Sequence, residues 1–337
     1  MLMDGRTGAL LYEKNAFSQM DPASTTKIMT ALLVIEHGDL NQEVTVSRRA
    51  DATSGSSLHI GERQRYSRLD LLRGMLLRSG NDASVALAES EAGSVERFVA
   101  EMNIRAQQLG AFNTAYENTH GLTQSGHYSS AYDLALIART ALKQPLFQEI
   151  VKSQQQTITE LSGQSTRTIS STNQLLYGFP GADGVKTGTT TAAGRCVVAS
   201  ATRDNRQLIA VILKSGNRWG DASELLNWGF LQWQGVEVAA PGHAILHVPV
   251  RGGRRSTVGL SVHSPFWVDV RQNASFSTLV KAPASLKAPL STGNRVGFIS
   301  VVGSGLPPQR RGLYPDNAVR AKPIPLRIWH WILPWRH

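Results

Sequence analysis

The stretch "DPASTTKIMT" places Ser24 and Lys27 three residues apart, where a polar turn gives way to an apolar run. On a helix, residues at this spacing share a face, so the lysine amine can approach the serine hydroxyl. Such a lysine acts as a general base only if burial or a nearby cation lowers its pKa. Pro22 and Ala23 put Ser24 at the predicted helix start, where unpaired backbone N–H groups favour developing negative charge. The pair therefore suits a nucleophile and its base, although a serine that caps a helix is the more ordinary interpretation.

Two further polar motifs can belong to the same site. In "RSGND", Ser79 and Asn81 interrupt a helical pattern, where a hydroxyl can relay a proton and an amide can hold a substrate carbonyl. In "DGVKTGTT", Lys186 and Thr187 lie on a predicted strand, where an amine and a hydroxyl could bind a carboxylate. Gly188 leaves one face of this strand bare, so that a substrate backbone can approach. Taken singly, these motifs are also typical of a helix–turn–helix corner and of an edge strand protected by a lysine. Because the three motifs occur in this order, 55 and then 107 residues apart, they favour a single catalytic site.

The surrounding pattern predicts a mixed α/β (α+β) domain, in which helices cover an antiparallel sheet. Its first residues read as a strand, an Asp-Gly turn and a second strand. Apolar periodicity then predicts helices, and from residue 184 the pattern changes to strands before a last helix. The predicted helices cover 24–37, 67–93 with a break at 79–81, 94–110, 129–142 and 221–233, and the predicted strands cover 185–190, 194–203 and 206–216.

Charge divides the 337-residue chain into two regions. Residues 241–337 hold 13 Lys/Arg and two acids, whereas residues 1–240 hold 22 basic and 23 acidic residues. We place the boundary near "EVAAPG", with a catalytic domain over 1–236 and a small all-β domain over 242–322. Short strand-like runs separated by Gly, Pro and Ser predict this second domain, and they lie at 243–250, 256–262, 267–270, 276–282 and 295–302.

The last residues, 323–337, are rich in tryptophan and arginine. The eight residues between Pro325 and Pro334 are too few to cross a bilayer. Their composition suits a segment at a membrane interface beside anionic lipids, and the alternative is a tail packed on the β-domain. A basic domain is also found in nucleic-acid-binding proteins, but the sequence has no recognised nucleic-acid-binding fold, so we expect no nucleic-acid partner.

The three motifs together are the set found in penicillin-binding proteins and related β-lactamases. The sequence resembles the low-molecular-mass penicillin-binding proteins that are serine D-Ala-D-Ala carboxypeptidases. "MDGRTGALLYEKN", "LLRSGNDASVALAE", "ENTHGL" and "GADGVKTGTTTAAGRCVVASATR" look like that family's blocks, which run through residues 2–230. The second domain resembles the family more loosely, chiefly at "LKAPLSTGNRVGFISVV".

The resemblance implies a transpeptidase-type catalytic domain with defined roles for the first two motifs. Ser24 would be the acylated nucleophile and Lys27 its general base. Ser79 and Asn81 would line the cleft. The backbone N–H groups of Ser24 and Thr189 would form the oxyanion hole.

The third motif would bind the substrate. The resemblance implies that Lys186 and Thr187 hold its terminal carboxylate, beside Gly188. Arg218, in "GNRWGDASELL", matches a family arginine that helps to hold the same carboxylate. We expect His120 to be structural or to support a residue of the site, and the family needs no metal or cofactor.

The implied substrate is a peptidoglycan stem pentapeptide that ends in D-Ala-D-Ala. The enzyme would act in peptidoglycan maturation and cell-shape control, and β-lactam antibiotics would be its covalent inhibitors. The implied location is extracytoplasmic, at the outer face of the bacterial cytoplasmic membrane. The amino terminus lacks a secretory signal, so we expect a truncated start. A DD-endopeptidase or transpeptidase on the same scaffold, and a catalytically silent wall-binding protein, remain alternatives. A β-lactamase fits less well, because the chain has no Glu-x-x-Leu-Asn segment.

Overall fold

The structure is a computed structural model, which describes residues 1–303, 305 and 307–323. The chain forms two compact units, Met1–Gln232 and Trp233–His337. Of the tryptophan- and arginine-rich segment 323–337, all but the first residue lies outside the described residues. Among the helices of the described part, none is long and apolar enough to cross a membrane.

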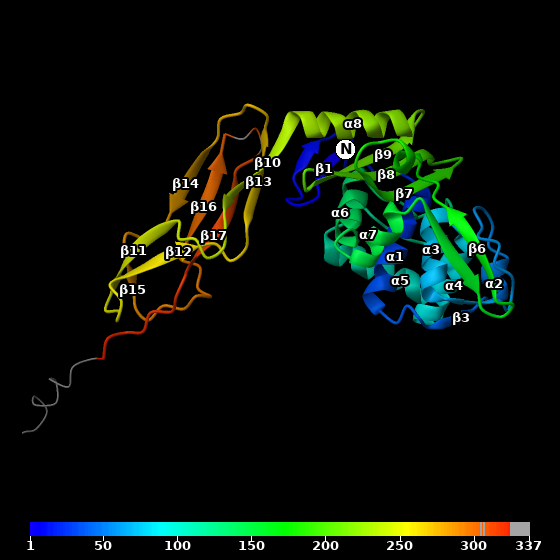
Figure 1. Cartoon of the computed structure of the whole chain (residues 1–337), viewed down its shortest axis with the longest axis horizontal. Coiled ribbons are helices and arrows are strands. Elements are labelled where there is room, and N and C mark those ends of the chain that lie inside the picture. Colours follow the sequence, from blue (N-terminus) through cyan, green and yellow to red (C-terminus); the bar gives the residue numbers. More distant parts are fainter. Residues whose placement is uncertain (304, 306, 324–337) are drawn as a thin grey trace, which may run out of the picture. The chain divides into compact units, whose positions relative to one another are not determined.

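The first unit is built on a five-stranded antiparallel sheet in the order β2-β1-β9-β8-β7. The first two strands come from the amino terminus, and the last three follow one another late in the unit. β1 lies between β2 and β9, so the beginning and the end of the unit meet inside one sheet (Figure 1). The strands are β1 Leu2–Asp4, β2 Leu10–Tyr12, β7 Ala182–Thr190, β8 Gly194–Arg203 and β9 Arg206–Ser215.

Helices cover this sheet, as the sequence predicts, and they lie on both of its faces (Figure 1). One helix, α8, lies on one face, and the other helices lie on the opposite side. The helices are α1 Lys27–His37, α2 Arg48–Asp51, α3 Arg68–Arg78, α4 Asn81–Ala92, α5 Val95–Leu109, α6 Ala131–Ala141, α7 Pro145–Lys152 and α8 Arg218–Gln232, with short 3₁₀ helices η1 Ala23–Thr26 and η2 Gln174–Tyr177. Two small two-stranded sheets, β3 Glu43–Thr45 with β4 Arg65–Ser67 and β5 Gln155–Glu160 with β6 Ser165–Ser170, complete the unit.

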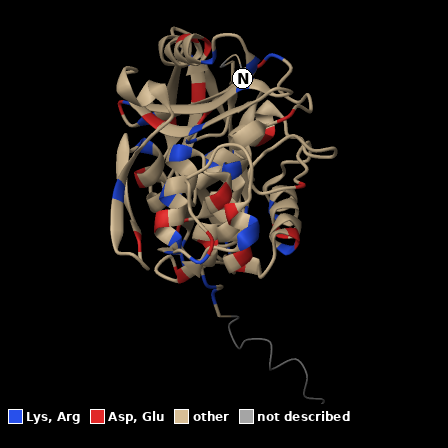
Figure 2. Cartoon of the chain, turned by 90° about the vertical axis from the view of Figure 1, so that its right-hand side faces the viewer, with Lys and Arg blue, Asp and Glu red and all other residues tan. Residues whose placement is uncertain are grey.

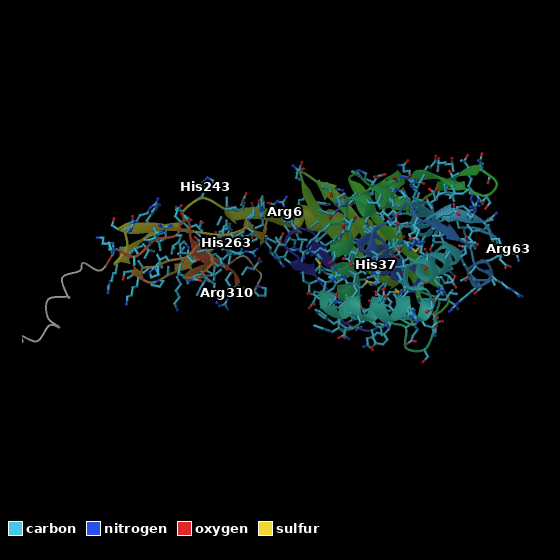
Figure 3. All side chains as sticks on the ribbon, turned by 90° about the horizontal axis from the view of Figure 1, so that it is seen from below. Arg6, His37, Arg63, His243, His263 and Arg310 are labelled. Atoms are coloured by element: carbon cyan, nitrogen blue, oxygen red, sulfur yellow. The ribbon has the colours of Figure 1, made fainter. Side chains whose placement is uncertain are left out.

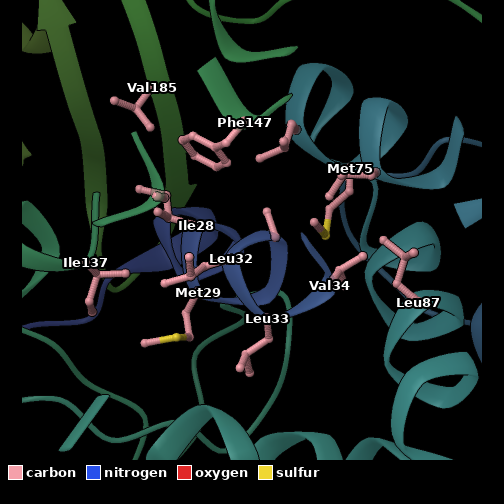
Figure 4. Packing of buried hydrophobic residues seen from close by; sticks show 14 of the residues in the cluster. Ile28, Met29, Leu32, Leu33, Val34, Met75, Leu87, Ile137, Phe147 and Val185 are labelled. Atoms are coloured by element: carbon pink, nitrogen blue, oxygen red, sulfur yellow. The ribbon is translucent and has the colours of Figure 1, made fainter. Parts of the chain in front are cut away.

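Helix α1 is the centre of the hydrophobic core. Its first eight residues are all buried, so this part of the helix is packed against other elements on every side. Figure 4 shows Ile28 and Leu32 among buried side chains of other elements, which include Met75 of α3, Phe147 of α7 and Val185 of β7. This packing holds the amino-terminal end of α1 in a fixed position next to the sheet.

The second unit is all-β. Its main sheet has six strands in the order β14-β16-β17-β12-β11-β15, and a separate ladder pairs β10 with β13. The strands are β10 Trp233–Ala239, β11 Leu246–Arg251, β12 Thr257–Ser261, β13 Phe266–Arg271, β14 Ser277–Lys281, β15 Leu286–Lys287, β16 Gly297–Val302 and β17 Gln309–Pro315.

The division between the units falls after Gln232, a few residues before the boundary expected from composition. The reason is β10, which begins immediately after α8 and pairs along its length with β13. Residues 233–236, assigned to the catalytic domain from the sequence, therefore belong to the second unit. The predicted last helix likewise begins earlier than expected, at Arg218, and ends before Trp233.

Candidate active site

Ser24 lies in a 3₁₀ turn that precedes the first long helix. The sequence predicts one helix from residue 24, but the structure has η1 over Ala23–Thr26 and α1 only from Lys27. In a 3₁₀ helix residues i and i+3 eclipse each other, so the turn aligns Lys27 directly with Ser24. Neither η1 nor α1 has a side-chain cap, so the Ser24 hydroxyl does not serve as the ordinary helix cap.

The Lys27 amine is surrounded by three oxygen atoms. Its Nζ donates to Ser24 Oγ at 3.0 Å, to Asn81 Oδ1 at 2.7 Å and to the backbone carbonyl of His120 at 2.8 Å. Lys27 is completely buried, whereas Ser24 is partly exposed. The amine is thus held in one position, within proton-transfer distance of a hydroxyl that substrate can reach.

The turn of the second motif brings Asn81 to this amine. Ser79 ends α3 with a left-handed backbone (φ 67°), and α4 begins at Asn81. The Asn81 amide is fixed in turn, because its Nδ2 donates to the Ser54 carbonyl at 2.7 Å. Ser79 is buried in the same turn, but its hydroxyl makes no hydrogen bond to another described residue. The structure therefore brings Asn81 into direct contact with Lys27 and leaves Ser79 beside the contact.

Strand β7 approaches the 3₁₀ turn at Gly188. A Cβ atom at position 188 would lie 2.9 Å from the Ser24 backbone nitrogen and 2.9 Å from Ala23 Cβ. These distances are shorter than real Cβ contacts, so only glycine allows the strand to come this close. The third motif and the first are therefore in contact through their backbones.

The polar side chains of β7 lie around this point. Lys186 is buried and its Nζ donates to the Thr187 carbonyl at 3.2 Å, while Thr187 Oγ1 lies 2.9 Å from Thr172 Oγ1. Arg218, at the start of α8, donates through Nη1 to Thr189 Oγ1 at 2.9 Å and to the Gly188 carbonyl at 3.0 Å. Two basic side chains and two threonine hydroxyls thus lie on β7 or in contact with it, an arrangement that suits a carboxylate.

Burial and like charge set the protonation of the two lysines. Burial lowers the pKa of Lys27 well below its ordinary value, and the charge of Lys186 lowers it further, while Asp82 opposes the shift. Burial, together with the charge of Arg218, lowers the pKa of Lys186 to about 7. Since both causes favour a neutral Lys27, its amine can accept a proton from Ser24.

The His120 carbonyl is a contact that the motifs do not reveal. The His120 side chain is expected to be structural, and burial lowers its pKa to about 3, so the ring is neutral. Asn118 fixes the turn behind this carbonyl: its Oδ1 accepts from Gly121 N at 2.7 Å and its Nδ2 donates to Leu122 O at 2.9 Å. A backbone oxygen carries no side-chain signal, so only the block "ENTHGL" as a whole points to this segment.

The comparisons with known proteins agree with this geometry. The family model described as D-alanyl-D-alanine carboxypeptidase matches residues 1–217. The chain belongs to the D-alanyl-D-alanine carboxypeptidase family. It is 32% identical over 316 residues to D-alanyl-D-alanine carboxypeptidase DacF of Bacillus subtilis. The matched region covers 90% of this chain and 81% of DacF.

Two further relatives extend the likeness across both units. D-alanyl-D-alanine carboxypeptidase DacC of Escherichia coli is 33% identical over 353 residues, covering 99% of this chain and 86% of that protein. The crystal structure of penicillin binding protein 5 from Haemophilus influenzae is 29% identical, has a TM-score of 0.85, and is matched over 95% of this chain and 96% of that one. The predicted penicillin-binding-protein fold is confirmed, and this carboxypeptidase is a serine peptidase of the hydrolase class.

Proposed function

We propose that this D-alanyl-D-alanine carboxypeptidase works through an acyl-enzyme on Ser24, with neutral Lys27 as general base. One observation carries the proposal: the Lys27 amine is fully buried, its pKa is strongly lowered, and its Nζ lies 3.0 Å from Ser24 Oγ. A desolvated lysine is the kind of base that activates a serine hydroxyl at neutral pH. Its substrate class is the D-Ala-D-Ala end of peptidoglycan stem peptides, and β-lactams acylate the same group.

The reaction takes place in two balanced steps. Lys27 takes the Ser24 proton while Oγ attacks the carbonyl carbon of the penultimate D-alanine. The C–N bond then breaks, the leaving nitrogen receives the proton from Lys27, and D-alanine departs. Water then attacks the Ser24 ester and Lys27 takes its proton. The C–Oγ bond breaks, Lys27 returns the proton to Ser24 Oγ, and the shortened peptide leaves. Ser79 and Asn81 line the cleft, and Asn81 holds the Lys27 amine in place.

The tetrahedral intermediates need donors for the oxyanion. We assign this role to the backbone N–H groups of Ser24 and Thr189, which the close contact at Gly188 supports. The terminal carboxylate of the peptide binds Lys186, Thr187 and Arg218. The first two lie on β7, and Arg218 of α8 donates to the same strand, so charge and hydroxyl donors are close together.

The proposal includes a location. The family's wall substrate supports an extracytoplasmic enzyme at the outer face of the cytoplasmic membrane. The composition of 323–337 supports contact with the membrane surface, and the lack of a nucleic-acid-binding pattern supports a protein without nucleic-acid partners.

Mass spectrometry after penicillin treatment tests the central claim. The unchanged protein gains one penicilloyl mass on the peptide that contains Ser24, and Ser24→Ala gains none. An unchanged protein without an adduct would contradict the claim and revive a catalytically silent wall-binding protein. Rapid turnover of penicillin, in place of a long-lived adduct, would instead indicate a β-lactamase.

Product analysis separates the remaining alternatives. With a pentapeptide and an added amine acceptor, we expect free D-alanine and tetrapeptide as the main products. A transpeptidase would transfer the acyl group to the amine, and an endopeptidase would cleave cross-linked dimers faster than pentapeptides.

A further inference from the structure

The second unit carries a cluster of five basic residues at one corner of its sheet, which we name the basic corner: Arg251, Arg254, Lys287, Arg320 and Lys322. All five are exposed. Their backbones are joined directly: Arg251 of β11 pairs with Lys287 of β15, and Arg254 N donates to Arg320 O at 2.8 Å. Lys322 N donates to Gly252 O at 2.8 Å, which closes the corner.

Pairing of like charges makes this corner unusual. Arg251 and Lys287 are partners in a parallel ladder, so their side chains share one face of the sheet. Gly253 and Ala321 form an antiparallel bridge, and in the next position along it Arg254 lies opposite Arg320. Like charges on directly opposed strand positions destabilise a sheet, so two such pairs work against folding stability.

Acidic side chains do not offset this charge. The sequence of the second unit has three acids, Glu237, Asp269 and Asp316. Asp269 is fully buried, and Asp316 N bonds to Gly259 O, away from the corner along β12. In the first unit, by contrast, arginines pair with carboxylates, as Arg68 does with Glu91 at 3.0 Å, and Figure 2 shows acidic and basic residues interspersed.

The chain leaves the described structure at this corner. Residues 320–322 bond to 252–254, and the next residues in the sequence are the tryptophan-, isoleucine- and arginine-rich segment 323–337. Figure 1 shows the end of the described chain leaving the unit on the side of β11 and β15. Basic residues next to an apolar, aromatic segment match the two chemistries of an anionic lipid surface, phosphate groups above hydrocarbon.

We propose that the basic corner binds the headgroups of anionic phospholipids and forms a second, electrostatic contact with the membrane beside segment 323–337. The lipid phosphates relieve the repulsion within each like-charge pair, so a feature that destabilises the isolated sheet becomes useful at the surface. This inference rests on the membrane contact proposed above, but not on the catalytic chemistry.

Vesicle sedimentation with the full chain tests the proposal. The probes are phosphatidylcholine vesicles with and without phosphatidylglycerol, at low and high salt. Each basic residue near an anionic surface contributes about fivefold to the partition coefficient, so Arg251→Gln/Lys287→Gln lowers binding to the anionic vesicles about 25-fold. Arg254→Gln/Arg320→Gln gives a similar loss from the other like-charge pair. Binding of the unchanged chain weakens as salt screens the charges.

The matched control is Lys281→Gln/Arg310→Gln, which removes the same charge elsewhere in the sheet. Lys281 lies on β14, the edge strand opposite β15, and Arg310 extends from β17 (Figure 3). We expect its vesicle binding to stay within about twofold of the unchanged chain, since its charges lie away from the corner. Penicillin labelling of Ser24 stays unchanged in all variants, which separates this test from that of the proposed function.

Two outcomes would overturn the proposal. Corner variants that bind anionic vesicles as well as the control variant does would remove the role of the corner. Corner variants that bind vesicles normally but lose binding to insoluble peptidoglycan would identify a wall polymer as the partner instead.

Discussion

Lys186 lowers the pKa of Lys27 through its positive charge, and both side chains are buried at the site. Replacing Lys186 by alanine removes this charge, so the pKa of Lys27 rises. The acidic limb of the kcat/KM profile reports protonation of the base, and it therefore moves to higher pH in Lys186→Ala. The measurement is a pH profile with a soluble pentapeptide from pH 5 to 9.

The same variant also loses a side chain that we propose to bind the substrate carboxylate, so we expect its kcat/KM to fall at every pH. The position of the limb, not its height, is thus the informative quantity. An acidic limb that stays where it was would show that burial alone sets the pKa of Lys27. Arg218→Gln is the control, because Arg218 does not lower the pKa of Lys27 directly.

Gly188 allows the close contact between β7 and the 3₁₀ turn that carries Ser24. Gly188→Ala introduces a Cβ 2.9 Å from Ser24 N, so the strand must move away from the turn. Displacements of about 1 Å in an active site cost roughly 100-fold in rate, and we expect a loss of that order in the rate of acylation by penicillin. Gly216→Ala is the matched control, because a Cβ there meets nothing within 4 Å. Equal acylation rates in the two variants would contradict the role of the contact.

Asn118 positions the carbonyl that holds the Lys27 amine. In Asn118→Ala the turn at Gly121 loses its side-chain bonds, and the His120 carbonyl can move away from Lys27 Nζ. We expect the acylation rate to fall about 10- to 100-fold, while noncovalent penicillin affinity changes less. Stopped-flow acylation kinetics separate the two quantities.

The control for Asn118 is a second asparagine that holds the same loop. Asn103 Nδ2 donates to the Tyr116 carbonyl at 2.9 Å and its Oδ1 accepts from Tyr116 N at 2.8 Å, without touching the lysine. Losing a buried hydrogen-bond partner costs about 1–3 kcal/mol of stability in either variant. If Asn103→Ala lowered the acylation rate as much as Asn118→Ala does, the cause would be a general loosening of the loop and not the position of the His120 carbonyl.

His127 makes the stability of the first unit depend on pH. Burial lowers its pKa to about 4, and its Nδ1 accepts from Glu117 N at 3.0 Å, so the folded protein holds it neutral. Between pH 6.5 and about 4 the unfolded chain binds the extra proton, so the free energy of unfolding falls as pH falls. The slope for one histidine is about 1.4 kcal/mol per pH unit.

Urea unfolding at pH 6.5 and 5.5 measures this slope. In His127→Gln we expect the loss of stability over this interval to be smaller than in the unchanged chain, by up to the contribution of one histidine. The interval lies above the ordinary carboxylate titrations, so the difference between the two proteins isolates the imidazole. Equal slopes would show that His127 is not held neutral.

The sequence predicts the elements of the site better than the way in which they meet. Helix periodicity and turn residues predict a helix start at Ser24 and a break at Ser79, since these signals are local. The contact at Gly188 and the His120 carbonyl depend on backbone atoms brought together by tertiary packing, so no side-chain pattern encodes them. The 3₁₀ turn at Ala23–Thr26 was missed for a related reason, because its i to i+3 geometry is set by packing against β7.

The pairing of β1 with β9 joins residues about 200 positions apart, and Met1 N donates to Val211 O. Every helix of the first unit except α8 is encoded between these two strands. A nascent chain therefore cannot complete its central sheet until nearly all of the unit has been synthesised, which means slow folding with a high contact order. The contact between Ser24 and Gly188 likewise joins residues about 160 positions apart, so acylation by penicillin reports a chain in which these distant segments have met.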